Sequence, residues 1–235
     1  PQDVEGEAYD YPAYFFRKRV HRITRPAAVE EELEDLAEIL SRAEKPLIIV
    51  GGGVKYSQAG EAVESFCEEF KIPFGETQAG KSACRSSHPY CLGGIGVTGT
   101  LASNVIAKDA DVVLAIGSRL SDFTTGSKRL FGREDVRFLT INNCRFHAYK
   151  MDAVKAVGDA KATLEALAEK LRGRGYISAY RGEIEAAKEA WDAELKRLGE
   201  ITYTGESFEP LIHARDPRTI PEFVELTKGR ITQTA

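Results

Sequence analysis

A run of five apolar residues that ends in a glycine constrains this chain more than any other feature. The run is Val112 to Ile116, and Gly117 follows it directly. An uninterrupted apolar run of this length is typical of a strand buried on both faces, and such strands belong to parallel sheets. A second run, Leu47 to Val50, also ends in glycine. The two runs predict an α/β domain with polar loops at the carboxyl ends of its strands.

Amphipathic segments alternate with these strands. Apolar residues at helical spacing predict helices over 29–43, 59–70, 101–108 and 160–171, and shorter apolar runs predict further strands over 72–74, 136–141 and 154–157. This alternation predicts a doubly wound, mostly parallel, Rossmann-like sheet of about six strands with helices on both faces. Ser57 and Asp159 precede two of the helices and are predicted to cap them, with Thr98 and Thr100 as cap candidates for a third.

Three parts are predicted along the chain. Residues 1–25 are expected to be a linker, residues 26–176 the Rossmann-like domain, and residues 177–235 a helical extension that includes a helix over 180–198 and a short one over 220–226. The linker holds a cluster of tyrosines and phenylalanines. Two alternatives stay open for this cluster: it packs on the domain surface, or it contacts a neighbouring domain. Because the first residues are irregular and lack Met, we expect the chain to be a piece of a larger enzyme.

Charge and cysteine content exclude several classes of protein. The formal net charge is −4, which argues against a nucleic-acid partner, and no apolar run approaches the roughly 20 residues of a membrane helix. The four cysteines include no Cys-x-x-Cys pair, so we expect reduced thiols and a cytoplasmic protein. Cys84, His88 and Cys91 lie close together in sequence, but their spacing fits no common zinc module, and we predict no metal site.

Two glycine-rich turns are candidate binding segments. Gly51, Gly52 and Gly53 follow a predicted strand, and Gly99 lies between Thr98 and Thr100 before a predicted helix; backbone amides at such turns can approach a phosphate. The first turn lacks the third glycine of the dinucleotide fingerprint. A tight turn that requires glycine is therefore slightly favoured over ligand contact.

The loop after the central strand supplies the candidate charged groups. Arg119 and Asp122 follow Gly117 within five residues. They either pair with each other or face a ligand at the carboxyl end of the sheet. His88 precedes a proline and has no carboxylate near it in sequence, so we expect a loop histidine rather than an acid–base group.

Five motifs in order along the chain carry a family resemblance. They are Tyr9-Asp10-Tyr11-Pro12, Phe16-Arg17-Lys18-Arg19-Val20-His21, Gly75-Glu76-Thr77-Gln78-Ala79-Gly80-Lys81, Gly93-Gly94-Ile95-Gly96-Val97-Thr98-Gly99-Thr100 and Ala115-Ile116-Gly117-Ser118-Arg119-Leu120-Ser121-Asp122-Phe123-Thr124-Thr125-Gly126. Together they resemble the central domain of thiamine-diphosphate-dependent enzymes of the acetolactate synthase type, and most closely the branch that hydrolyses a carbon–carbon bond to open a cyclic 1,2-dione in inositol catabolism. The resemblance implies a parent enzyme that uses thiamine diphosphate and Mg²⁺.

The same resemblance implies that the chemistry lies outside this chain. The partners would be the pyrimidine-binding and pyrophosphate-binding domains of the parent, which is expected to be a homo-oligomer. Here Gly158-Asp159 continues with Ala160 and does not match the family's metal-binding signature. We therefore expect no catalytic residue and no firmly bound cofactor. The candidate residues Gly51, Gly52, Gly53, Thr98, Gly99, Thr100, Arg119 and Asp122 would line an interdomain or vestigial nucleotide cleft.

Two other functions remain as alternatives. A stand-alone module that binds FAD or NAD would use the same sheet and the same glycine turns. An NAD-dependent deacylase would have a similar sheet together with a zinc module built from four cysteines.

Overall fold

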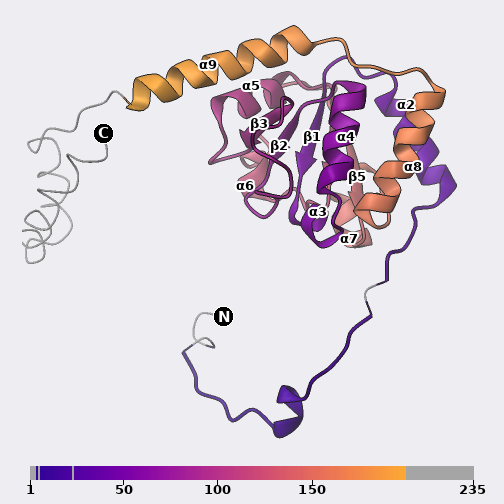
Figure 1. Ribbon diagram of the computed structural model, residues 1–235, viewed down its shortest axis with the longest axis vertical. Helices are drawn as coiled ribbons and strands as arrows, with labels where there is room; N and C mark the ends of the chain where they lie inside the picture. Colours follow the sequence, from indigo (N-terminus) through magenta and orange to yellow (C-terminus); the bar gives the residue numbers. More distant parts are fainter. Residues whose placement is uncertain (1–3, 5, 23, 200–235) are drawn as a thin grey trace, which may run out of the picture.

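The computed structural model describes residues 4, 6–22 and 24–199, and its centre is one six-stranded parallel sheet (Figure 1). The strand order is β3-β2-β1-β4-β5-β6. The strands are β1 (Pro46–Val50), β2 (Phe74–Glu76), β3 (Cys91–Gly94), β4 (Val112–Ile116), β5 (Arg137–Asn142) and β6 (Val154–Val157). The predicted doubly wound parallel sheet is confirmed.

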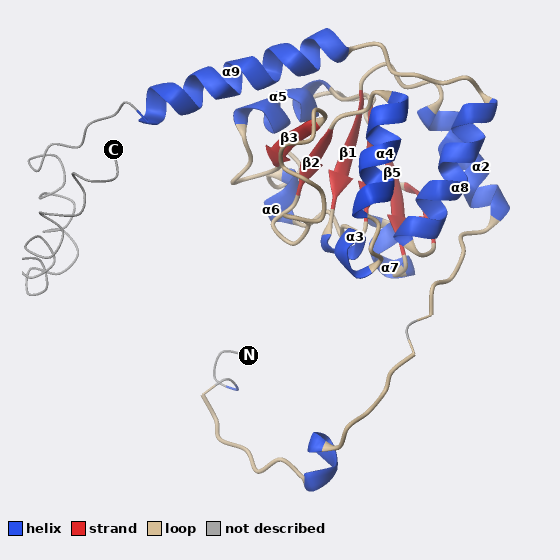
Figure 2. Cartoon of the chain, viewed as in Figure 1, coloured by secondary structure: helices blue, strands red, loops and turns tan. Residues whose placement is uncertain are grey.

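Helices lie outside the sheet layer (Figure 2). They are η1 (Ala13–Phe16), α2 (Glu30–Leu40), α3 (Gly52–Tyr56), α4 (Gly60–Phe70), α5 (Leu101–Asp109), α6 (Asp122–Thr125), α7 (Arg145–Ala148), η2 (Lys150–Asp152), α8 (Ala160–Gly173) and α9 (Arg181–Gly199). α8 packs against both α2 and α4 on one side of the sheet, while α5 packs against β3 and α9. Because strand connections are right-handed, the step from β3 back to β4 places α5 on the face opposite α4.

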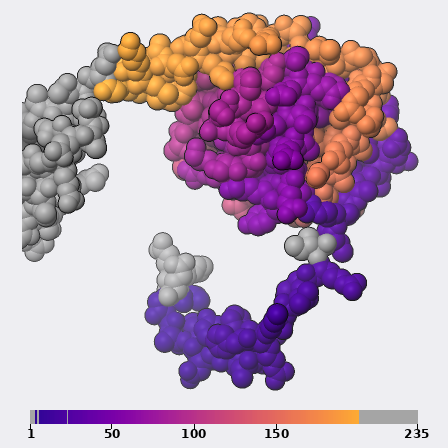
Figure 3. All heavy atoms as spheres, viewed as in Figure 1, coloured from indigo at the N-terminus to yellow at the C-terminus, as the bar shows by residue number. Residues whose placement is uncertain are grey.

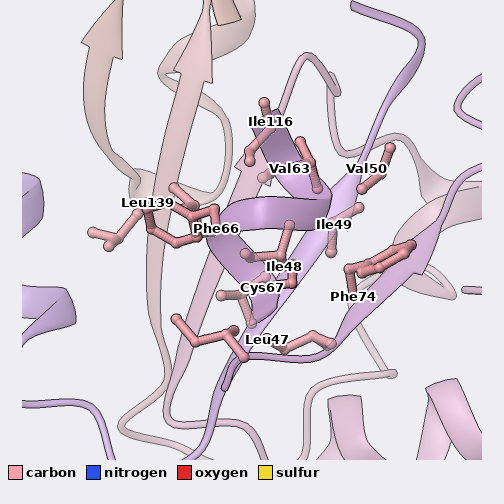
Figure 4. Close-up of a cluster of buried hydrophobic side chains, with 14 of the residues drawn as sticks. Leu47, Ile48, Ile49, Val50, Val63, Phe66, Cys67, Phe74, Ile116 and Leu139 are labelled. Carbon is pink, nitrogen blue, oxygen red and sulfur yellow. The ribbon is translucent and has the colours of Figure 1, made fainter. Parts of the chain in front are cut away.

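The two central strands are buried along their whole length. Every residue of β1 and β4 is buried, and the strands pair in register, with Pro46 beside Val112 and Val50 beside Ile116. Side chains of β1 point alternately to both faces, where they meet Val63, Phe66 and Cys67 of α4 on one side (Figure 4). Burial on both faces explains why these runs carry no polar residue.

Short elements account for the errors in the predicted boundaries. The sequence predicts a loop where β3 forms, because Gly93 and Gly94 are poor strand formers; β3 is an edge strand, and such positions tolerate glycine. The strand predicted at 72–74 starts after Pro73, which has no N–H to donate to a neighbouring strand. α3, α6 and α7 have only four or five residues each, too few to give a helical pattern.

Two of the predicted helix caps are confirmed, and one is wrong. The Thr100 hydroxyl accepts a hydrogen bond from Ser103 N, and the Asp159 carboxylate accepts from the backbone of α8. Ser57 does not cap α4, whose first turn has no side-chain cap. The Ser57 hydroxyl instead accepts from Lys161 N at 3.0 Å, so it serves the start of α8, about a hundred residues away in sequence.

Two parts extend beyond the domain body. Residues 9–22, here called the arm, stand away from the domain, and the C-terminal half of α9 continues past α5 (Figure 3). The tyrosines and phenylalanines of the arm are exposed, so of the two alternatives left open for this cluster, packing on the domain surface is not observed. The helix predicted at 180–198 is confirmed as α9, whereas the one predicted at 220–226 lies outside the described residues. None of the described helices combines the length and hydropathy that a bilayer span requires.

Candidate functional site

A cleft of about 800 Å³ lies at the carboxyl ends of β1, β4, β5 and β6. β1 and β4 are neighbours, but the chain leaves β1 toward β2 on one side and leaves β4 toward β5 on the other. Open α/β sheets bind ligands at such a topological switch point. The polar side chains that line the cleft come from six loops: Thr24, Arg25, Tyr56, Ser57, Thr77, Gln78, Ser118, Arg119, Ser121, Thr124, Asn142, Asn143, His147 and Asp159.

The floor of the cleft is two glycine turns in direct backbone contact. Gly51 N donates to Ile116 O at 2.8 Å, and Gly53 N donates to Gly117 O at 3.0 Å. A Cβ atom on Gly51 would lie 2.3 Å from Gly117 O, and one on Gly53 would lie 2.7 Å from Gly117 Cα. The amides of Gly51 and Gly53 are therefore occupied. The glycines at these positions allow the two turns to touch.

One wall of the cleft is held by an arginine, a serine and an aspartate. Arg25 Nη1 donates to Asp159 Oδ2 at 3.0 Å and to Ser57 O at 2.6 Å, while the Ser57 hydroxyl donates to Asp159 Oδ2 at 2.7 Å. Asp159 N also donates to Pro26 O at 2.7 Å. The Asp159 carboxylate thus caps α8 and fixes the chain before α2. The backbone N–H groups that it caps are therefore not available to bind an anion at the start of α8.

The predicted site residues separate into two groups. Gly52, Gly53 and Arg119 line the cleft. Gly51 is buried beneath it, and Thr98, Gly99, Thr100 and Asp122 are not among its lining residues. The Thr100 hydroxyl is occupied by the cap of α5. The turn that contains Thr98 lies beside α6, because Val97 N donates to Phe123 O at 2.9 Å.

Arg119 and Asp122 do not form the ion pair that the sequence allows. Both side chains are exposed, and within the described residues the ion pairs of this region join Arg133 to Asp135 instead. Arg119 therefore presents its guanidinium to the cleft without a protein carboxylate.

Several cleft residues were not predicted. Arg25, Tyr56 and His147 come from three separate segments that only the fold brings together. Asn142 and Asn143 had a usable signal, because Asn142 ends β5 and Asn143 follows it, at the same edge of the sheet as Arg119.

His88 and three of the four cysteines, Cys67, Cys84 and Cys91, are buried groups of the core. His88 is buried against Phe74, and its Nδ1 accepts from Tyr90 N at 3.2 Å. Nε2 then carries the proton and lies 3.2 Å from Glu68 Oε1. Burial raises the pKa of Cys84 to about 12 and also raises the pKa values of Cys67 and Cys91. Cys144 lines the cleft, and the part of the chain that the structure describes has no group of three or more ligands able to hold a metal, so nothing in that part favours the four-cysteine zinc module of a deacylase.

Two buried glutamates, Glu76 and Glu64, have pKa values that their environments shift in opposite directions. Burial raises the pKa of Glu76 above its usual value, an effect that the charge of Lys81 and the N–H of Cys84 only partly oppose. Glu76 Oε1 is buried without a hydrogen-bond partner among the described residues. Burial would also raise the pKa of Glu64, but the side chain and N–H of Arg85 hold that pKa below its usual value.

We expect Glu76→Gln to increase the free energy of unfolding at pH 8 by about 1 kcal/mol, because a neutral amide removes the cost of ionising a buried carboxyl. The pKa of the Glu76 carboxyl is higher in the folded protein than in the unfolded chain. Its contribution to stability is therefore complete below the unfolded pKa and is lost as the pH rises through the folded pKa. The gain should therefore vanish near pH 4 in urea titrations. The matched control is Glu64→Gln, which should destabilise the protein at pH 8 because it weakens the bonds to Arg85. If both substitutions changed the free energy of unfolding equally at pH 8 and at pH 4, the opposite environments of Glu76 and Glu64 would be contradicted.

Comparison with known proteins places these features in a family. The model of the thiamine pyrophosphate enzyme central domain matches residues 33–167. Over all 235 residues the chain is 59% identical to the 3D-(3,5/4)-trihydroxycyclohexane-1,2-dione hydrolase of Clostridium perfringens and 53% identical to the hydrolase of the same name from Bacillus thuringiensis. The chain spans 37% and 36% of the length of these two relatives.

A solved structure is similar in fold. It is described as a thiamin diphosphate-dependent enzyme isolated from Mycobacterium smegmatis, and it matches with a TM-score of 0.55 at 21% identity. The match covers 65% of this chain and 30% of that chain. At this identity the likeness supports the fold alone.

Proposed function

The chain belongs to the thiamine pyrophosphate enzyme family, in which it is a central domain, and from this premise we propose that it is the middle layer of a hydrolase that opens a cyclic 1,2-dione by cleaving a carbon–carbon bond. The observation that carries the proposal is the identity of 59% over the whole chain to a trihydroxycyclohexanedione hydrolase. In this proposal the parent enzyme acts in myo-inositol catabolism, as a cytoplasmic homo-oligomer that uses thiamine diphosphate and Mg²⁺.

We assign the reacting groups to other parts of the parent chain. Thiamine diphosphate supplies the carbanion chemistry of such enzymes. The described residues do not fit the Mg²⁺–diphosphate end of this cofactor, because Asp159 is the only carboxylate that lines the cleft and it is already bonded to Arg25, Ser57 and α8. Pyrimidine-binding and pyrophosphate-binding domains would hold the cofactor. This chain would hold those domains in place and, by itself, would not catalyse the reaction.

A second role for the cleft is kept because of one observation. The exposed Arg119 faces a cleft at the topological switch point, where nucleotides bind in related sheets. The alternative function is therefore a module that binds FAD, NAD or a simpler adenine nucleotide. Gly52, Gly53 and Arg119 would contact such a ligand directly. Gly51, Thr98, Gly99, Thr100 and Asp122 would support the surrounding turns.

A domain exchange tests the proposal. We expect that a Clostridium perfringens hydrolase in which this chain replaces the matching segment keeps its dione hydrolase activity, whereas the purified chain alone shows none with thiamine diphosphate and Mg²⁺. The matched control replaces the same segment with that of the Mycobacterium smegmatis protein, which has the same fold at 21% identity and should give a folded but impaired enzyme. Turnover by the isolated chain, or a folded but inactive first chimera, would overturn the proposal.

Thermal melts of the same purified chain separate the alternative. Stabilisation by ADP, FAD or NAD that is lost in Arg119→Ala but kept in Arg133→Ala would favour the nucleotide module. Arg133 is a suitable control because its guanidinium is engaged by Asp135.

A further inference from the structure

The loop that carries Arg119 holds this residue firmly at the cleft. Both of its neighbours in sequence are buried. Ser118 O accepts a hydrogen bond from Asn142 Nδ2 at 3.1 Å, and Leu120 N donates to Ser118 Oγ at 3.2 Å. Leu120 also has a φ of +46°, a conformation that is unfavourable for a residue other than glycine and that concentrates at binding sites. The fold thus fixes an arginine whose charge no carboxylate among the described residues neutralises.

Four further polar side chains line the same cleft without a hydrogen-bond partner among the described residues: Tyr56, Gln78, Asn143 and His147. They come from α3, the loop after β2, the residue after β5 and α7, which meet at one end of the sheet (Figure 1). None of the four side chains is buried. A phenol, two amides and an imidazole can each donate and accept hydrogen bonds. Such a set suits a ligand that carries several hydroxyl groups.

The cleft has no place for a diphosphate. Diphosphates bind to backbone N–H groups at glycine turns and helix starts. Gly51 N and Gly53 N are already bonded to the end of β4 and to Gly117, and Asp159 caps the N–H groups at the start of α8. Arg25, the other arginine of the cleft, is bonded to Asp159. One available arginine suits a ligand with a single negative charge, and a nucleotide diphosphate carries at least two.

The size and the remaining lining of the cleft suit a small molecule. Its volume of about 800 Å³ lies in the usual range of ligand sites. Ile95 and Ile141 add apolar surface for a carbon skeleton. The features of the cleft together predict a small ligand with one carboxylate and several hydroxyl groups.

The proposed function, on which we rely for this step, supplies a molecule of that kind. Hydrolysis of the bond between two adjacent carbonyl carbons breaks one C–C bond. The hydroxyl of water joins one carbon, which becomes a carboxylic acid, and the hydrogen joins the other, which becomes an aldehyde. No oxidant is needed, and the ring hydroxyls are kept. A trihydroxycyclohexane-1,2-dione therefore gives an open chain with three hydroxyls and a carboxyl group that is ionised at neutral pH.

We propose that the cleft is a binding site for a polyhydroxylated monocarboxylate, the chemical class of the product of the proposed hydrolysis. Arg119 binds the carboxylate, for which the planar guanidinium is suited. Gln78, Asn143 and His147 bind the hydroxyl groups. This ligand uses the groups that the fold leaves available and needs none of the backbone N–H groups that are already bonded.

Calorimetric titration of the full 235-residue chain with D-glucuronate tests the site. We expect saturable binding at one site. Arg119→Gln should weaken it at least about tenfold, because a charge-assisted hydrogen bond is lost. D-glucose, which has a hydroxymethyl group in place of the carboxylate, should bind the parent chain at least about tenfold more weakly for the same reason. Asn143→Ala should weaken D-glucuronate binding about threefold, the effect of one neutral hydrogen bond.

Arg145→Gln is the matched control, because Arg145 is exposed on α7 near the cleft but does not line it. It should change the affinity less than about twofold, since exposed charges at a distance are screened. Circular dichroism checks that each variant is folded.

Three results would overturn the site: no binding of D-glucuronate at about 10 mM, equal binding by Arg119→Gln and the parent chain, or displacement of D-glucuronate by ADP that binds more tightly. The last result would assign the cleft to a nucleotide. Because the titration needs no turnover, its failure is distinct from that of the domain exchange. An inactive but folded chimera whose cleft still binds D-glucuronate through Arg119 would overturn the proposed function and leave the carboxylate site in place.

Discussion

Gly117→Ala should lower the free energy of unfolding by about 3 kcal/mol, because it adds backbone strain and a steric clash at one position. Gly117 has a φ of +60°, and a left-handed conformation costs a non-glycine residue about 1 kcal/mol. In addition, the new Cβ would lie 2.6 Å from Gly53 Cα. Backbone at that distance cannot move aside without separating β1 from β4, which adds roughly 1–3 kcal/mol of overpacking.

Gly126→Ala isolates the two contributions. Gly126 also has a left-handed backbone, with a φ of +55°, but the nearest atom to its Cβ would be Leu130 N at 3.8 Å. The substitution should therefore cost only the conformational term, about 1 kcal/mol. Urea unfolding followed by circular dichroism measures both variants. Equal losses would mean that the contact between the two glycine turns does not constrain the sheet.

Asp159→Ala should lower the free energy of unfolding by about 2–3 kcal/mol at pH 7. The carboxylate accepts from two backbone N–H groups at the start of α8, from the Ser57 hydroxyl and from Arg25. Loss of a helix cap alone costs about 1 kcal/mol. The remainder comes from Arg25 and the buried Ser57, which lose a charged partner.

The effect of Asp159 should depend on pH. Burial would raise the pKa of Asp159, but the Ser57 hydroxyl, the N–H of Ala162 and Arg25 together hold that pKa below its usual value. A lowered pKa contributes stability above the unfolded pKa, and this contribution is lost as the pH falls through the folded pKa. The difference between parent and variant should thus shrink below about pH 4.

Asp135→Ala is the control for Asp159, because Asp135 is an exposed partner of Arg133 and such pairs contribute little. Thermal unfolding at pH 3, 5 and 7 would compare the two variants. A loss that is the same at every pH would show that the charge on Asp159 has no role.

Burial made most of the fold predictable. Val112 to Ile116 and Leu47 to Val50 have no polar residue because both of their faces are covered, and that property can be read without a structure. β3 was missed because its pairing with β2, and not its own Cys-Leu-Gly-Gly sequence, makes it a strand. Ser57 was assigned to the wrong helix because its partner, the start of α8, is distant in sequence.

The candidate site was less predictable than the fold. The strand that precedes Arg119 showed that this residue would reach the carboxyl edge of the sheet. Arg25 and Tyr56 had no such signal in the sequence. Arg25 lies in the segment before α2 and Tyr56 ends the five-residue helix α3, so only the folded chain brings them to the cleft. Net charge also concealed the arm: a value of −4 for the whole chain hides the run Arg17-Lys18-Arg19.

α9 packs on the domain through its first half only, and its second half extends beyond the domain. Ile184 and Ala187 are buried, while the residues after Trp191 are largely exposed. Nineteen residues at 1.5 Å each make a rod of about 28 Å. Insertion of one residue between the anchored and free halves would turn the far end by roughly 100°, since a helix has 3.6 residues per turn. The number of residues from Ile184 to Gly199 therefore sets both the distance and the direction in which the chain leaves this domain.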